Sequence, residues 1–143
     1  MSIMIGSILL SLIFFFLGAV HFNWATGGTL GYKQSLPTKE SGDLVMTPKK
    51  FDSALIGVGL SAFGLFYIME SELVSHQLPA WVFTYGGWII PAIFLLRAIG
   101  DFKYVGFFKR VKSTKFSKFD KKFFTPLCLG IAIWGILIQM ANY

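Results

Sequence analysis

Residues 3–20 read IMIGSILLSLIFFFLGAV, and no side chain in this stretch is ionisable. Crossing a hydrocarbon core of ~30 Å takes about 20 helical residues, because each residue advances the helix by about 1.5 Å. Between Ile8 and Phe16 only Ser11 interrupts the apolar run, so a helix here has no polar face and does not suit a soluble protein. The stretch therefore predicts a membrane span over residues 3–22.

Three further apolar blocks of similar length follow, at residues 51–69, 80–98 and 123–141. The 143-residue chain is 55% hydrophobic and only 14% charged, which is far from the balance of a soluble globular domain. We therefore predict an all-α fold: one membrane domain over residues 1–143, built as a bundle of four transmembrane helices. Loops at residues 23–50 and 99–122 are expected on one side of the membrane.

The alternative interpretation of the first block is a cleavable signal peptide. No Lys or Arg precedes its apolar run, and no small-x-small cleavage site follows it directly. We expect it to be retained as a span. The single cysteine, Cys128, falls inside the fourth span and forms no intrachain disulfide.

The basic residues are confined to two segments, residues 33–50 and 97–122, which together hold all 13 Lys and Arg. With four spans, these two segments lie on the same side and both termini lie on the other. Lys and Arg resist translocation and are attracted to the anionic inner leaflet. The sequence therefore predicts a multi-pass protein of the cell membrane, with cytoplasmic basic loops and both termini outside.

A net charge of +6 raises nucleic acid as a partner, but the position of the charge favours lipid. Phe116, Phe119 and Phe123 share one helical face while neighbouring lysines project from another. This pattern is typical of a helix that lies in the membrane interface, with rings at the acyl boundary and ammonium groups at lipid phosphates. We expect anionic lipid heads as partners of the basic loops, and no nucleic acid.

Small residues predict how the helices pack, because helices in lipid associate where their backbones approach closely. Ser53, Gly57 and Ser61 recur every four residues along the second span, which suggests that this span is central. The same stripe suits a homodimer as well as an internal contact. Tyr67 resembles an aromatic-belt residue at the opposite end of the span.

Most of the remaining polar residues gather at the predicted cytoplasmic ends of the spans. Arg97 and Asp101 are four residues apart and are able to pair on one helix face. Such a pair near lipid is a candidate functional site, and an Arg that reaches for lipid phosphate with Asp101 as its partner is an equal alternative. Trp24, Gly28, Lys109, Arg110 and Asp120 complete the set of candidate binding residues.

His21 closes the first span and is a candidate for proton transfer together with Asp101. Capping of a helix end through a carbonyl is the other interpretation. A metal site is not expected, because the second histidine, His76, belongs to the opposite side of the membrane. The chain has no G-x-S-x-G, C-x-x-C, H-E-x-x-H or phosphate-loop motif, and we expect no cofactor.

Four stretches carry a resemblance to a known family: HFNWATGGTLGY at residues 21–32, the pair Leu36-Pro37, RAIGDFKYVGFFKRVKSTKFSKFD at residues 97–120, and TPLCL at residues 125–129. They resemble the small bacterial membrane proteins catalogued as domain of unknown function 3995. The resemblance implies a four-helix integral membrane protein and supplies no activity. It also implies that the family shares His21, Trp24, Gly28, Arg97, Asp101, Gly106 and Asp120.

Two functions stay open on these residues. The first is a membrane module that binds a lipid or a partner protein at its cytoplasmic rim. The second is a small enzyme acting on a lipid or isoprenoid-like substrate, in which His21 and Asp101 exchange protons and Arg97 holds an anionic group. A small multidrug transporter is disfavoured, because the first span has no carboxylate.

Overall fold

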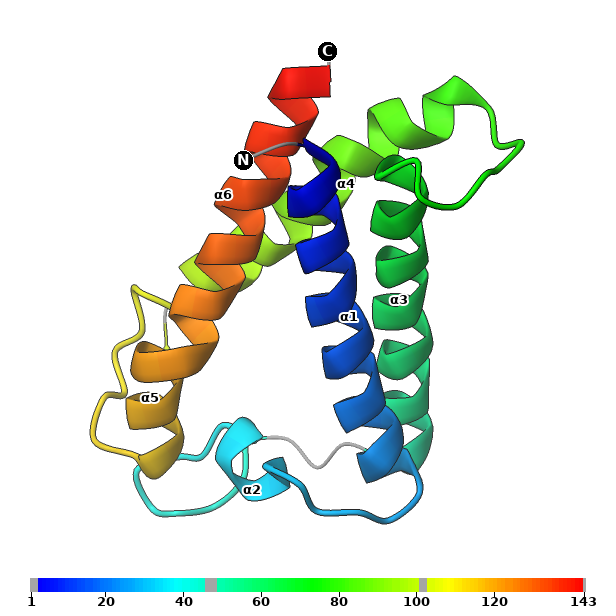
Figure 1. Ribbon diagram of the computed structural model, residues 1–143. Coiled ribbons are helices and arrows are strands. Elements are labelled where there is room, and N and C mark those ends of the chain that lie inside the picture. The colour runs from blue at the N-terminus through cyan, green and yellow to red at the C-terminus, as the bar shows by residue number, and fades with distance from the viewer. Residues whose placement is uncertain (1–2, 46–48, 101–102, 143) are drawn as a thin grey trace.

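The computed structural model describes residues 3–45, 49–100 and 103–142 (Figure 1). Its helices, in chain order, are α1 (Ile3–Ala25), α2 (Tyr32–Ser35), α3 (Lys50–Glu70), α4 (Ala80–Ile99), α5 (Lys115–Phe119), the π-helical turn η1 (Asp120–Phe124) and α6 (Thr125–Asn142). Within these ranges no strand forms, and Thr38 and Leu44 make an isolated β-bridge. The predicted all-α fold is confirmed.

Four helical segments are long and apolar enough to cross a membrane. They are Ile3–Ala25, Lys50–Glu70, Ala80–Ile99 and Phe116–Asn142. The predicted spans agree with the first three to within a few residues, and the fourth begins at Phe116 instead of residue 123. The loops that follow α1 and α4 lie at the same end of the bundle (Figure 1), which we call the basic end.

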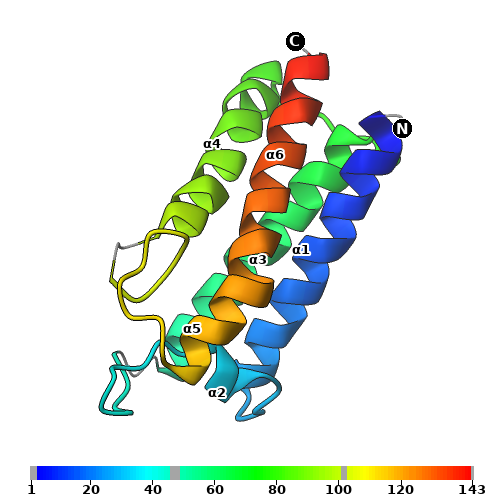
Figure 2. The same ribbon diagram turned by 90° about the vertical axis from the view of Figure 1, so that its left-hand side faces the viewer.

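The helices pack as two pairs, α1 along α3 and α4 along α6 (Figures 1 and 2). Glycines bring α1 and α3 together: a Cβ on Gly18 would lie 2.8 Å from Oγ of Ser61 and 3.2 Å from the carbonyl oxygen of Gly57. Ser11 donates a hydrogen bond to the Gly64 carbonyl across the same contact, at 2.8 Å. The stripe of small residues therefore serves an internal contact, and the second span is paired with the first rather than central.

The second pair is joined by a proline, a glycine and a buried amide. Gly135 of α6 faces Pro91 of α4, and a Cβ on Gly135 would lie 2.6 Å from the proline ring. One turn further along α6, the fully buried Gln139 donates to the Thr84 carbonyl at 3.0 Å, and its amide fills the space beside Gly87. The small residues let α4 and α6 approach, and the amide is satisfied inside the bundle.

Aromatic rings join the two pairs from the middle of α1 and α3 towards the end opposite the basic end. Phe14 stacks on Tyr67 with ring centroids 5.7 Å apart and contacts Phe94 at 5.2 Å. Tyr67 is only 1% exposed, so its expected place in an aromatic belt is wrong. Its ring is in the core because Gly135 leaves room for the hydroxyl, 2.9 Å from where a Cβ would be.

The basic segment before the fourth span differs from the expected interfacial helix. The backbone stays helical from α5 through η1 into α6, so this segment extends the fourth span (Figure 1). Phe116 is turned inward and is 3% exposed, with its ring 6.0 Å from that of Phe124, whereas Phe123 is 51% exposed. The short helix α2 contacts α5 across the basic end.

Candidate functional site

A small hollow at the basic end lies where α1 ends and α3 begins. It has a volume of about 170 Å³, and we call it the rim pocket. Its lining residues are Trp24, Gly27, Gly28, Thr29, Tyr32, Lys49, Lys50 and Ser53. Two of the predicted binding residues, Trp24 and Gly28, are therefore brought together with a pair of lysines.

The glycine turn after α1 shapes one wall of the rim pocket. Gly27 has a φ of 95°, a left-handed conformation that glycine adopts without strain, and the chain turns back on α1 there. The Asn23 side chain occupies the space beside Gly28, and its Oδ1 accepts the backbone N–H of Leu30 at 3.3 Å. A larger residue at Gly28 would displace this amide and open the turn.

Aromatic side chains form the second wall. The indole Nε1 of Trp24 donates to the Leu30 carbonyl at 2.6 Å, which fixes the ring against the turn. Tyr32 of α2 meets this ring edge-on, with centroids 5.6 Å apart. The wall therefore depends on both α1 and the turn that follows it.

The two lysines come from the start of α3. The backbone N–H of Lys49 donates to Oδ2 of Asp52 at 2.8 Å, so the carboxylate caps the helix. Lys50 approaches the turn, since a Cβ on Gly27 would lie 3.7 Å from its Nζ. Neither lysine side chain forms an ion pair within the described ranges.

His21 lies on α1 behind the Trp24 ring, with ring centroids 4.6 Å apart. Its Nδ1 donates to the Leu17 carbonyl one turn earlier, at 2.8 Å. The imidazole thus bonds a carbonyl, but one inside α1 rather than at its end, because the helix continues to Ala25. The described contacts of His21 do not include Arg97, and its proposed partner Asp101 lies outside the described residues.

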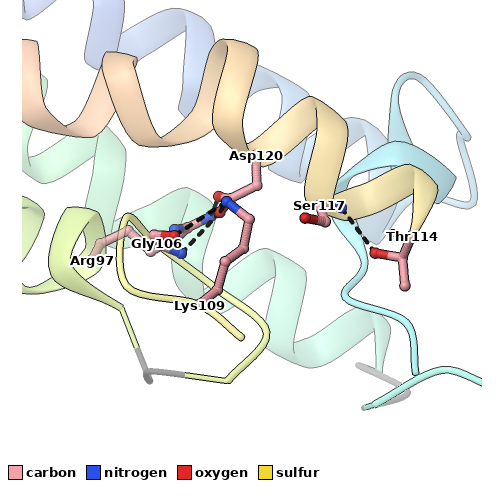
Figure 3. A network of polar contacts seen from close by, with 6 residues as sticks. All are labelled: Arg97, Gly106, Lys109, Thr114, Ser117 and Asp120. Carbon is pink, nitrogen blue, oxygen red and sulfur yellow. Dashed lines mark hydrogen bonds and ion pairs between the residues drawn. The ribbon is translucent and has the colours of Figure 1, made fainter. Parts of the chain in front are cut away.

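A second polar cluster, the Asp120 network, consists of Arg97, Gly106, Lys109 and Asp120 (Figure 3). Asp120 is fully buried at the start of η1. Its Oδ1 accepts from Nη2 of Arg97 at 3.0 Å, and its Oδ2 accepts from the Gly106 backbone at 2.8 Å and from Nζ of Lys109 at 3.2 Å. One carboxylate thus ties α4, the loop after it and the fourth span together.

Two glycines allow the loop to close on the end of α4. Gly100 and Gly106 have φ values of 86° and 89°, and a side chain on either would collide with the backbone of the other segment. The Phe107 N–H donates to the Ala98 carbonyl at 2.9 Å, which fixes the loop in register. Lys109 also donates to the Gly106 carbonyl, at 3.1 Å.

The Asp120 network is largely self-satisfied and therefore structural. Lys109 is 5% exposed and makes both of its described bonds within the network. Arg97 pairs with Asp120, while its Nη1 is buried and has no hydrogen-bond partner among the described residues. Arg110 is exposed nearby, and its backbone N–H donates to the Lys103 carbonyl at 3.0 Å.

Sequence reasoning missed half of the rim pocket. The signal was available: the glycine turn follows the first span, and Lys49 and Lys50 directly precede the second. Since these two spans are antiparallel neighbours, the segments meet at one end.

No cluster of three or more His, Cys, Asp or Glu side chains that could hold a metal occurs in the part of the chain that the structure describes.

Comparison with known proteins gives a family and no activity. The family model described as "Protein of unknown function (DUF3995)" matches residues 14–135, which includes the rim pocket and the Asp120 network. No curated protein and no solved structure matches the chain. On the extent of the family match, the chain belongs to the DUF3995 family of proteins of unknown function.

Proposed function

We propose that this protein is a multi-pass membrane protein whose rim pocket binds the anionic head of a membrane lipid. The observation that carries the proposal is the convergence of Lys49 and Lys50 on a hollow walled by Trp24, Tyr32 and a glycine turn. The lysines supply positive charge, and the aromatic rings supply a rigid apolar wall. The combination suits a phosphate group attached to a hydrocarbon body.

The size of the rim pocket supports a head group rather than a whole ligand. Pockets that enclose a drug-sized molecule measure about 300–1,000 Å³, and the rim pocket measures about 170 Å³. A phosphate head fits in such a space while its acyl chains stay in the bilayer. Ser53 and Thr29 add hydroxyl groups to the lining for hydrogen bonds to phosphate oxygens.

The charge around the rim pocket also supports an anion. The Asp52 carboxylate accepts the Lys49 backbone N–H and caps α3, so its described hydrogen bond is to the backbone and not to a lysine ammonium group. The two ammonium groups have no described carboxylate partner, so an anionic head would neutralise them. A basic side chain near an anionic membrane surface contributes about 1 kcal/mol to binding.

The expected orientation places the basic end at the cytoplasmic leaflet. The argument rests on the confinement of all 13 Lys and Arg to the two segments that lead to this end. It is supported by the arrangement in Figure 1, in which the loops after α1 and α4 share one end of the bundle. Anionic lipids are enriched on that side of the membrane.

Native mass spectrometry of the purified protein with added phosphatidylglycerol or phosphatidylcholine tests the proposal. Since two lysines contribute about 2 kcal/mol, Lys49→Gln/Lys50→Gln should weaken phosphatidylglycerol binding about 30-fold and leave phosphatidylcholine binding unchanged. The matched control is Lys39→Gln/Lys112→Gln, which removes the same charge from two exposed loop positions. Equal loss in both double variants would show that net charge, not the rim pocket, attracts the lipid.

The enzymatic alternative receives no support from the described contacts. It requires His21, Asp101 and Arg97 to face one substrate. The structure instead places His21 against its own helix and Arg97 against Asp120. A binding role needs none of these residues as a proton carrier.

A further inference from the structure

A second and larger hollow lies between α1 and α6, on the flank of the bundle. It measures about 410 Å³, and we call it the α1–α6 groove. Its lining residues are Leu9, Leu10 and Ile13 of α1, with Pro126, Leu127, Gly130, Ile131 and Trp134 of α6. All of these residues belong to apolar segments long enough to cross a membrane.

The α1–α6 groove is closed at one end and open along α6. Trp134 packs against Gly6 of α1, where a Cβ would lie 2.7 Å from the indole Nε1, so the two helices touch there. Towards the basic end α6 leans away from α1 (Figure 1). Gly130 keeps the floor of the groove empty, since no heavy atom lies within 4 Å of the place where its Cβ would be.

The surroundings of the α1–α6 groove determine what occupies it. A hollow on the flank of membrane-spanning helices borders hydrocarbon, and a volume of this size is within the range of about 300–1,000 Å³ that suits a ligand. Lipid tails are as apolar as the lining, so a chain gains little hydrophobic free energy by leaving the bilayer for the groove. Selection of one lipid over another must therefore come from its head group.

The nearest basic residue before the α6 lining of the groove along the chain is Lys122. Lys122 and Phe123 precede the lining residues Pro126 and Leu127 by four positions, about one helical turn. Both side chains are exposed, and Nζ of Lys122 lies 5.4 Å from the Phe123 ring centroid. We propose that the α1–α6 groove holds one acyl chain of an anionic phospholipid that enters sideways from the bilayer, with Lys122 at its phosphate.

The α1–α6 groove and the rim pocket both use α1 but share no lining residue, and the inference stands without the proposed head-group site between α1 and α3. The rim pocket takes a head alone, whereas the α1–α6 groove takes a chain and orders it against Trp134. Substitution of Lys49 and Lys50 tests the rim pocket, and substitution of Lys122 tests the α1–α6 groove.

Fluorescence of Trp134 reports occupancy of the groove directly. A variant with Trp24→Phe, Trp81→Phe and Trp88→Phe retains Trp134 as its one tryptophan. It is reconstituted in equimolar phosphatidylglycerol and phosphatidylcholine, with bromine on the acyl chains of one lipid or of the other. Because one lysine near the surface contributes about 1 kcal/mol, occupancy by phosphatidylglycerol should exceed that by phosphatidylcholine about fivefold, and its brominated form should quench Trp134 more strongly.

Two substitutions and their matched controls decide the outcome. Gly130→Leu fills the groove and should abolish the difference in quenching. Gly59 of α3 also has open space around the position of its Cβ, and Gly59→Leu should leave the difference intact. Lys122→Gln should equalise the two lipids, and Lys39→Gln should not. Equal quenching by both lipids in the parent protein, or an unchanged difference in Gly130→Leu, would overturn the proposal.

Native mass spectrometry of the protein with all four tryptophans provides a second measurement if the triple variant does not fold. Gly130→Leu should then bind one phosphatidylglycerol fewer than Gly59→Leu. Retention of the same number of lipids by both variants would count against the α1–α6 groove. A loss that follows Lys49→Gln/Lys50→Gln but not Gly130→Leu would assign the lipid to the rim pocket alone.

Discussion

The carboxylate of Asp120 lies 3.0 Å from Nη2 of Arg97, although 23 positions separate the two residues in the chain. This contact joins the end of α4 to the start of the fourth span. Since Lys109 reaches the same carboxylate, the loss of Asp120 would leave two cations without their partner at the end of the bundle. The Asp120 network is therefore the part of the basic end most sensitive to substitution.

Asp120→Asn should lower the free energy of unfolding in detergent by about 3–5 kcal/mol, because a buried charge without its partner is strongly unfavourable. In a double-mutant cycle with Arg97→Met, the double variant should lose less stability than the sum of the two single variants. Asp43→Asn is the control, since Asp43 is an exposed loop residue, and it should change stability by no more than about 0.5 kcal/mol. Additive effects of Arg97 and Asp120 would contradict the network.

Gly87→Ala should destabilise the α4–α6 pair, because the Gln139 amide fills the space that the new methyl group would take. Overpacking of this kind typically costs about 1–3 kcal/mol. The double variant Gly87→Ala/Gln139→Ala should recover part of the loss, which thermal unfolding in detergent would measure. Gly59→Ala, whose Cβ meets no neighbour, serves as the control. If Gly87→Ala matched Gly59→Ala, the packing described for this pair would be incorrect.

Gly18→Val should separate α1 from α3, since its side chain would meet the Gly57 carbonyl and Oγ of Ser61. A backbone carbonyl inside a helix has little freedom to yield, so we expect a large loss of thermal stability. Light scattering during size-exclusion chromatography, corrected for detergent, gives the mass of the particle. A stable particle of half the original mass would instead show that the small-residue stripe joins two copies of the chain.

Topology is testable with reporters fused at the C-terminus. Alkaline phosphatase, which is active outside the cytoplasm, should be active there, and green fluorescent protein exported through the same route should not fluoresce. A fusion within residues 103–112 should give the opposite result, because this segment belongs to the basic end. Fluorescence of the C-terminal fusion would reverse the predicted orientation.

Hydropathy alone was enough to predict four long apolar helices, because a bilayer demands a minimum apolar length and this chain has four blocks that meet it. The partner of Arg97 was not predictable in the same way. The i, i+4 rule selects Asp101, which lies outside the described residues, whereas the contact that the structure shows depends on the end of α4 at Ile99 and on Gly100, whose positive φ turns the chain. The contact with Asp120 arises from this turn and from tertiary packing, which local spacing does not report.

Aromatic residues illustrate the same limit at two places. Tyr67 has the residue type and the sequence position of an aromatic-belt residue. Its hydroxyl nevertheless lies in the core, because Gly135 on another helix leaves space for it. The Phe116 face was predicted from helical periodicity, and the helix is present. Which way the Phe116 face points depends on how the helix continues into the fourth span. In that continuous helix Phe116 is buried in the bundle and Phe123 is exposed.

The rim pocket was half predicted. Trp24 and Gly28 were selected because they lie at the end of a span, where polar and glycine residues are unusual. Lys49 and Lys50 were counted only toward orientation. Their role beside the glycine turn depends on the pairing of α1 with α3, which follows from Gly18 and Gly57 on facing helices.

The pairing of the helices gives α2 a particular position. Aromatic contacts join the two pairs from the middle of α1 and α3 towards the end opposite the basic end, through Phe14 with Phe94 and Phe66 with Phe83. At the basic end α2 connects the two pairs, because its Tyr32 contacts Trp24 of α1 and the helix packs against α5. One wall of the rim pocket and the contact between the pairs at this end therefore depend on the same four-residue helix.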